Sequence, residues 1–96
     1  ESISAGLDYP GVSPIHCFLK DTKRARYTYV TDEEALKAHV MVTKFEKLNP
    51  SLEPSHAFAE AIKIAPKLRK DTIIIVNSCG DAKKDRDILK ERLGKY

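Results

Sequence analysis

Apolar residues recur at intervals of three and four between Thr31 and Asn49, and this spacing predicts an amphipathic helix. Thr31 is a suitable N-cap, because its hydroxyl can accept a hydrogen bond from the amide of Glu34. The Glu34 side chain can in turn reach back to the amide of Thr31. Asn49 and Pro50 end the pattern, so this stretch is the most clearly defined element of the sequence.

Two further helical patterns follow in the second half of the chain. Ser55 is expected to cap a helix whose apolar face continues until Pro66, after a short link over residues 51–54. Residues 85–93 predict a shorter helix that ends at Gly94, since glycine readily takes the left-handed conformation found after helix ends.

Two stretches have the composition of β-strands. Residues 26–31 (RYTYVT) alternate and are rich in aromatic and β-branched side chains. Residues 71–77 (DTIIIVN) form a continuous β-branched run, which is typical of a strand buried in a parallel sheet with helices on both faces. With a short helical turn over residues 16–20, the pattern predicts an α/β fold with a parallel-sheet segment and flanking helices.

Two features suggest that the α/β segment is incomplete as a stand-alone domain. Two strands are too few for a self-contained doubly wound sheet. The chain of 96 residues starts at Glu1 and has its only methionine at Met41, which fits processing or a fragment of a longer protein.

Composition narrows the class of protein. A hydrophobic fraction of 42% and a charged fraction of 32% are typical of one small globular domain. The net charge of +3 is mild and the basic residues are interspersed, so we expect no nucleic-acid partner. No stretch is long and apolar enough for a membrane span and no signal peptide is evident, so we expect a cytoplasmic protein without a membrane partner.

The turn after residues 71–77 is the first candidate site, because ligands of open α/β sheets bind beyond the carboxyl ends of the strands. Cys79 and Gly80 lie in this turn. Cys79 is either a ligand-facing group or a small buried apolar residue. Cys17 lies far away in the sequence, so one disulfide is possible but no framework of disulfides is indicated.

Two other regions carry candidate polar groups. Glu53 precedes the expected helix cap and can be solvated, paired with a cation or placed in a pocket. His56 either titrates near neutral pH or makes a structural hydrogen bond. Asp8 lies in a loop rich in glycine and proline, where it is either an exposed turn residue or a gate that pairs with a cation. The three histidines have no metal-ligand spacing.

Several motifs in order resemble the C-terminal part of the tryptophan synthase β-chain family, which consists of fold-type II enzymes dependent on pyridoxal phosphate. The motifs are SAGLDYPGV, TDEEAL, LNPSLEPSHAFAEAIK, IIIVNSCGDAKKD and DILKERLG. The resemblance covers essentially the whole chain, so residues 1–96 are expected to form the C-terminal part of the catalytic region. The opening loop and the LEPSHA segment are its most specific parts.

The resemblance implies roles for individual residues. Asp8 matches the acid that closes the active site by pairing with an arginine and helps to position the amino-acid substrate. Glu53 matches the catalytic carboxylate beside the cofactor ring. Tyr9 and Gly11 match positions whose backbone carbonyls bind a monovalent cation, Na⁺ or K⁺.

The cofactor-binding turn departs from the family pattern. Cys79, followed by Gly80, stands where the family usually has a serine bonded to the pyridine nitrogen, and a thiol is a weaker hydrogen-bond partner than a hydroxyl. Asp81 and Lys83 occupy positions where the family has the opposite charge or a different one. The network around the cofactor site is therefore expected to differ here.

The implied activity of the full-length β chain is the joining of L-serine and indole to give L-tryptophan and water. An α chain that supplies indole from indole glycerol phosphate, and a β-chain homodimer, are the implied partners. The Schiff-base lysine and the glycine-rich phosphate loop belong to earlier parts of the family sequence. We therefore expect the 96 residues to be inactive without the rest of the β chain.

Two alternatives remain open from the sequence. One is another pyridoxal-phosphate enzyme of the same fold type, similar to serine dehydratase or cysteine synthase. The other is a non-catalytic interaction module from a truncated gene, which the short length and mild charge permit.

Overall fold

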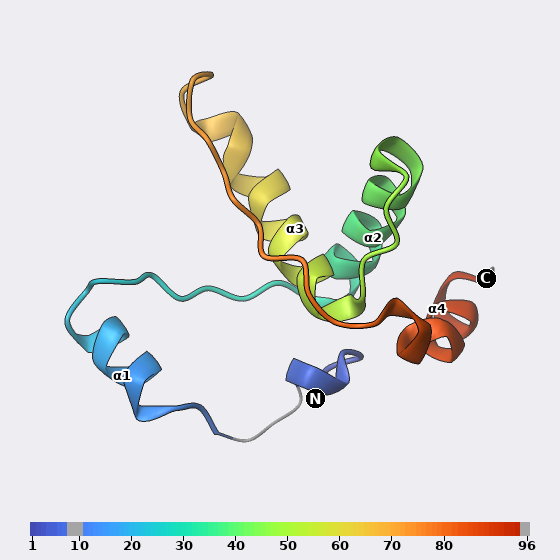
Figure 1. Ribbon diagram of the computed structural model, residues 1–96, viewed down its shortest axis with the longest axis horizontal. Helices are drawn as coiled ribbons and strands as arrows, with labels where there is room; N and C mark the ends of the chain where they lie inside the picture. Colours follow the sequence, from blue (N-terminus) through green and yellow to red (C-terminus); the bar gives the residue numbers. More distant parts are fainter. Residues whose placement is uncertain (8–10, 95–96) are drawn as a thin grey trace.

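Helices and connecting loops make up the parts of the chain that the computed structural model describes, residues 1–7 and 11–94 (Figure 1). These ranges contain no β-strand. In chain order the elements are η1 (Ala5–Leu7), α1 (Pro14–Asp21), α2 (Asp32–Glu46), α3 (Leu52–Ile64), η2 (Ala65–Lys67), η3 (Ala82–Asp85) and α4 (Arg86–Leu93).

The start of α2 has the expected capping box. The amide of Glu34 donates to the Thr31 hydroxyl at 3.2 Å, and the amide of Thr31 donates to Glu34 Oε1 at 2.9 Å. Lys63 of α3 pairs with the other carboxylate oxygen of Glu34 at 2.8 Å. These bonds lower the pKa of Glu34 to about 2, with the Lys63 contact as the largest cause. The sequence prediction for this helix start is confirmed.

The end of α2 contains a strained residue. Lys47, at the C-cap, is in the left-handed conformation with φ +57°. A side chain with a Cβ atom is disfavoured there, and glycine is the residue that this position usually takes. Lys47 is exposed, so its side chain can be removed without opening a cavity.

We therefore expect Lys47→Gly to raise the free energy of unfolding by about 0.5–1 kcal/mol, since it relieves the strain of the left-handed conformation. Urea denaturation followed by circular dichroism measures the change. Lys44→Gly is the matched control, because the same substitution within the last turn of α2 is expected to destabilise by about 1 kcal/mol. A lower urea midpoint for Lys47→Gly would contradict the interpretation.

Helix α3 begins earlier than predicted. It starts at Leu52 with Ser51 as the N-cap, so the expectation that Ser55 caps this helix is wrong. Pro54 lies in the first turn, where its missing N–H costs no intrahelical hydrogen bond. The buried Ser55 hydroxyl instead donates to the Ser51 carbonyl at 2.7 Å, one turn back along the chain.

The core forms where α2, α3 and α4 meet. Helices α2 and α3 pack against each other, and their small residues Ala35, Ala38 and Ala59 are buried. Leu36, Leu52 and Leu89 make the central apolar cluster, with one leucine from each helix. Leu52 and Leu89 are 0% and 1% exposed, so the first residue of α3 is at the centre of the core.

The two predicted strands are not strands in the structure. Residues 26–31 and 72–77 run as extended chain (Figure 1) and Asp71 lies in a turn, but neither stretch is a β-strand, so the parallel-sheet prediction is not confirmed. A strand requires ladder hydrogen bonds to a neighbour, and neither stretch lies beside another extended segment with which it forms a ladder. Ile73 and Ile75 are 85% and 91% exposed, as expected for a β-rich segment without a partner on one side.

The remaining helices agree with the sequence. Helix α1 includes the predicted turn over residues 16–20 and lies apart from the core on an extended arm (Figure 1). Helix α4 ends at Leu93, and Gly94 follows with φ +71°, as predicted. No helix in the described part of the chain has the length and apolar character to span a membrane.

Candidate functional site

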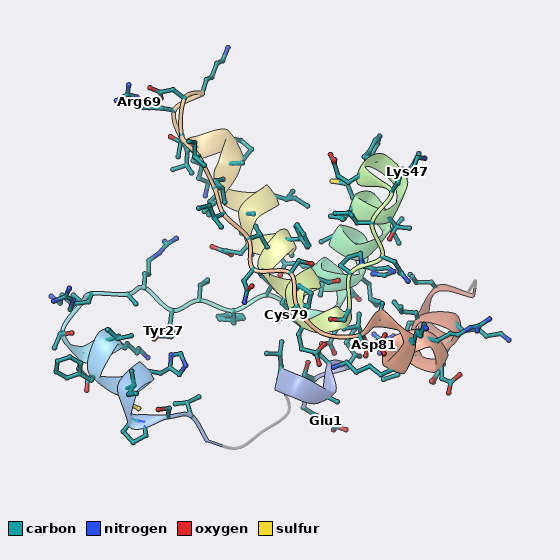
Figure 2. The ribbon with its side chains drawn as sticks, viewed as in Figure 1. Glu1, Tyr27, Lys47, Arg69, Cys79 and Asp81 are labelled. Carbon is teal, nitrogen blue, oxygen red and sulfur yellow. The ribbon has the colours of Figure 1, made fainter. Side chains whose placement is uncertain are left out.

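Three consecutive residues at the start of α3, residues 51–53, form hydrogen bonds to the turn and short helix over residues 79–85. The three contacts are Ser51 Oγ donating to the Cys79 carbonyl at 3.0 Å, the Leu52 amide donating to Asp85 Oδ2 at 2.7 Å, and Lys84 Nζ donating to Glu53 Oε1 at 2.6 Å. Figure 2 shows Cys79 and Asp81 where the chain passes the start of α3 on its way to α4. The predicted candidates Glu53, Cys79 and Gly80 therefore belong to one site.

Glu53 also connects this site to the N-terminal loop, which is the segment of residues 1–7 that includes η1. The amide of Gly6 donates to Glu53 Oε1 at 2.9 Å, so this one oxygen accepts from both Gly6 and Lys84. The second oxygen, Oε2, is buried and has no hydrogen-bond partner among the described residues. The hydroxyl of Ser4, which is 0% exposed, makes no hydrogen bond of good geometry within the part of the chain described, but it lies close enough to Glu53 to help lower the pKa of the carboxyl group. The site thus contains an unused buried carboxylate oxygen.

The charge state of Glu53 follows from these contacts. Burial is the largest single influence and acts to raise the pKa of the carboxyl group. The hydrogen bonds, led by that from Lys84 and including that from Gly6, outweigh it and lower the pKa to about 2. Lys84 has a raised pKa, chiefly because of its hydrogen bond to Glu53. Both groups are therefore charged at neutral pH.

Two glycines allow the close approach of the segments at this site. Gly80 has φ +91°, and a Cβ atom there would lie 2.7 Å from Ser51 Oγ. A Cβ atom on Gly6 would lie 2.7 Å from Glu53 Oε1. Because these distances are too short for a carbon atom, larger residues would push the turn and the N-terminal loop away from α3.

Two buried polar side chains, Asp85 and His39, lie next to the site. Asp85 is 3% exposed and caps α3 through the Leu52 amide, so it replaces the missing side-chain cap of Ser51. His39 of α2 is also fully buried, and its Nδ1–H donates to the Pro50 carbonyl at 3.0 Å. Burial lowers the pKa of His39, while the Pro50 carbonyl and the charge of Asp85 oppose this shift.

Sequence reasoning missed Lys84 and Asp85. Asp85 was expected only as the start of the last helix, and Lys84 lies in a short basic run that is typical of a solvated surface. The one local signal is that Asp85 is an acid next to a basic run and precedes an apolar pattern, which equally fits an ordinary helix start. Their partners lie more than 30 positions away, so no local pattern reveals them.

The structure places the other candidates as follows. Cys79 and Cys17 are both free and exposed, so the possible disulfide does not form. The Nδ1–H of His56 donates to the Leu52 carbonyl at 2.7 Å, which is the structural hydrogen bond that the sequence left open. Gly11 is exposed in a loop, and the described residues hold no group of three or more His, Cys, Asp or Glu side chains placed to bind a metal ion. Asp8 and Tyr9 lie outside the described residues.

A groove of about 790 Å³ lies next to the site. One wall is α3, and the other walls are the non-helical residues 28–31 and 74–77, with Asp32 at the start of α2. Leu7 from the N-terminal loop and His56 from α3 line the groove near Glu53, while Ala61 and Ile64 give it an apolar lining further along α3. Two sides of the groove thus have the composition of β-strands.

Comparison with known proteins identifies the family. The chain is 54% identical over 93 residues to the tryptophan synthase beta chain of Bordetella petrii, 54% over 92 residues to that of Fusobacterium nucleatum and 53% over 93 residues to that of Cereibacter sphaeroides. These matches cover 96–97% of this chain. The chain matches a segment of tryptophan synthase beta chains over nearly its whole length.

The match is to a segment of the family's sequence. The chain spans 23% of the length of each of these three curated relatives. No protein-family model matches the chain. The resemblance inferred from the sequence motifs is confirmed, and it includes the first turn of α3 and the turn over residues 79–85, the two parts of a tryptophan synthase beta-chain segment that meet in the site.

Proposed function

We propose that this chain is the C-terminal part, residues 1–96, of the catalytic region of a tryptophan synthase beta chain. The complete enzyme joins L-serine and indole to form L-tryptophan and water. The observation that carries the proposal is the identity of 54% over 97% of the chain to a protein named tryptophan synthase beta chain. The meeting of Glu53, Cys79 and Gly80 at one end of α3 supports it.

The residues of the site fit pyridoxal phosphate as the cofactor. Bound pyridoxal phosphate supplies an electron sink for the carbon atoms of the amino-acid substrate. Glu53 offers an ionised carboxylate with one unused buried oxygen, Oε2, for hydrogen bonding next to the ring. Cys79 offers an exposed thiol to the ring nitrogen, and Gly80 with its positive φ keeps the backbone of the turn close to α3. Groups for the phosphate and the covalent attachment belong to other parts of the enzyme.

The N-terminal loop contributes the remaining proposed groups. Asp8 closes the site by pairing with an arginine and helps to position the substrate, and the carbonyls of Tyr9 and Gly11 bind Na⁺ or K⁺. The support for this arrangement is the bond from Gly6 to Glu53, which fixes the start of the same loop to the site at 2.9 Å. Asp8 follows Gly6 by two positions in the sequence.

The rest of the beta chain is proposed to complete a parallel sheet. Residues 26–31 and 72–77 flank the groove of about 790 Å³ and are extended, with a composition that favours strands. An additional strand inserted there would give both segments the ladder partners that they lack. In the assembled enzyme the partners are an α chain and a second beta chain.

The test uses the complete protein that carries this chain, with pyridoxal phosphate, L-serine and indole, and measures L-tryptophan. We expect tryptophan to form and Glu53→Gln to lower kcat by about 10²-fold, because the substitution removes the carboxylate charge next to the reacting centre. Glu46→Gln is the matched control, since Glu46 is exposed at the end of α2, and it should leave kcat unchanged.

The products distinguish the alternatives. Pyruvate formed from serine without tryptophan would favour an enzyme similar to serine dehydratase, and cysteine formed from an activated serine and sulfide would favour one similar to cysteine synthase. A protein that neither binds pyridoxal phosphate nor turns over serine would overturn the enzyme proposal and favour an interaction module.

A further inference from the structure

We propose that Lys84 is a positioning residue for Glu53, which fixes its Oε1 atom so that only Oε2 remains for a ligand. The proposal rests on the proposed function for the role of Glu53. Its geometry is independent of that function, because it consists of contacts within this chain. Lys84 does not itself need to touch substrate or cofactor.

The first step of the argument is the saturation of Oε1. The Lys84 ammonium group lies 2.6 Å from this atom and the Gly6 amide lies 2.9 Å from it. The two donors come from opposite ends of the chain and meet at a residue in the first turn of α3. A carboxylate held by two donors at one oxygen has a fixed orientation, because rotation about its terminal bond would break both contacts.

The second step is the state of Oε2. This atom is buried and has no partner among the described residues, although an ionised carboxylate oxygen in such a place costs free energy unless it is paired. The buried Ser4 hydroxyl lies close to the Glu53 carboxylate and helps to lower its pKa, but it makes no hydrogen bond of good geometry to Oε2. Since Lys84 and Gly6 occupy the other oxygen, Oε2 is the one available to a hydrogen-bond donor of a ligand.

The third step concerns the charges around the pair. Glu53 forms its ion pair with Lys84 of η3. The negative charges of Asp81 and Asp85 in the same turn also raise the pKa of Lys84. Asp85 accepts a hydrogen bond from the Leu52 amide, and Asp81 accepts one from the Lys83 amide at 2.9 Å. Lys84 is thus the cation that pairs with Glu53.

The experiment measures the pKa of the Glu53 carboxyl group by NMR titration of the chain, with Lys84→Met as the variant. We expect the pKa of Glu53 to rise by about 1–3 units from its value of about 2, because the neighbouring positive charge is lost. Lys84→Arg should keep the pKa low, since it retains the charge. Lys83→Met, one position earlier and exposed, is the matched control and should leave it unchanged.

A reciprocal measurement keeps the proposal testable if Lys84→Met does not fold. In Glu53→Gln the pKa of the Lys84 ammonium group should fall, because its hydrogen-bonded carboxylate is gone. An unchanged Glu53 pKa in a folded Lys84→Met protein, or an unchanged Lys84 pKa in Glu53→Gln, would overturn the proposal. Neither titration needs a cofactor or substrate, so their failure is distinguishable from failure of the proposed function.

In the complete enzyme the same substitution gives a second readout. Lys84→Met should shift the acidic limb of the pH profile of kcat upwards by about 1 unit or more, following the pKa of Glu53. Lys84→Arg should restore the profile. A merely structural role for Lys84 would lower the amount of folded enzyme and leave the position of the acidic limb unchanged, which would overturn the positioning role.

Discussion

Replacing Leu52 with alanine should lower the free energy of unfolding by about 3 kcal/mol, the largest effect that we expect from a single substitution in this chain. Leu52 is 0% exposed and packs with Leu36 and Leu89, so its removal leaves a cavity where three helices meet. Urea denaturation followed by circular dichroism at neutral pH measures the loss as a lower midpoint with an unchanged slope.

The matched control is Leu48→Ala, which removes the same atoms from a side chain that is 52% exposed. Its effect should stay within about 0.5 kcal/mol, because little apolar surface is lost from the core. Equal effects of the two substitutions would show that α3 does not dock through its first residue, and the proposed core would then be wrong.

Replacing Asp85 with alanine is expected to cost about 2 kcal/mol. The substitution leaves the buried Leu52 amide without its acceptor at 2.7 Å and also removes the N-terminal cap of α3. Asp85→Asn keeps an acceptor oxygen and should cost about half as much. The same denaturation experiment measures both variants.

Asp87→Ala serves as the control for charge, because Asp87 is exposed in the first turn of α4. A loss of at most about 0.5 kcal/mol is expected for it, from the weakened interaction with the helix dipole. If Asp87→Ala destabilised the chain as much as Asp85→Ala, the buried cap would not explain the role of Asp85.

Local signals in the sequence predicted the helices well. The Thr31–Glu34 capping box and the terminating Gly94 depend on residues a few positions apart, so their physics is visible in the sequence. The start of α3 was misplaced at Ser55 because its actual cap is Asp85, which lies 33 positions from Leu52. A cap supplied from another element leaves no trace in the local pattern.

The strands were predicted from composition, which describes what a segment favours and not what it is paired with. Residues 72–77 remain extended, in agreement with their β-branched side chains, but a strand also requires a neighbour at hydrogen-bonding distance. For the candidate site, family motifs selected Glu53, Cys79 and Gly80, which the structure brings together. Lys84 joins this site through its ammonium group, 2.6 Å from Glu53 Oε1, and no local pattern indicates a contact across 31 positions.

The three consecutive bonds between the start of α3 and the turn over residues 79–85 couple ligand occupancy to folding. A ligand that recognises this turn in its docked form binds the native state and not the unfolded chain, so its binding free energy adds to the stability of the helical core. At about 100 times the dissociation constant this linkage amounts to about 2.7 kcal/mol. That is similar to the expected loss in Asp85→Ala, so a saturating ligand would offset the missing cap, and the protein's resistance to unfolding would depend on how much ligand surrounds it.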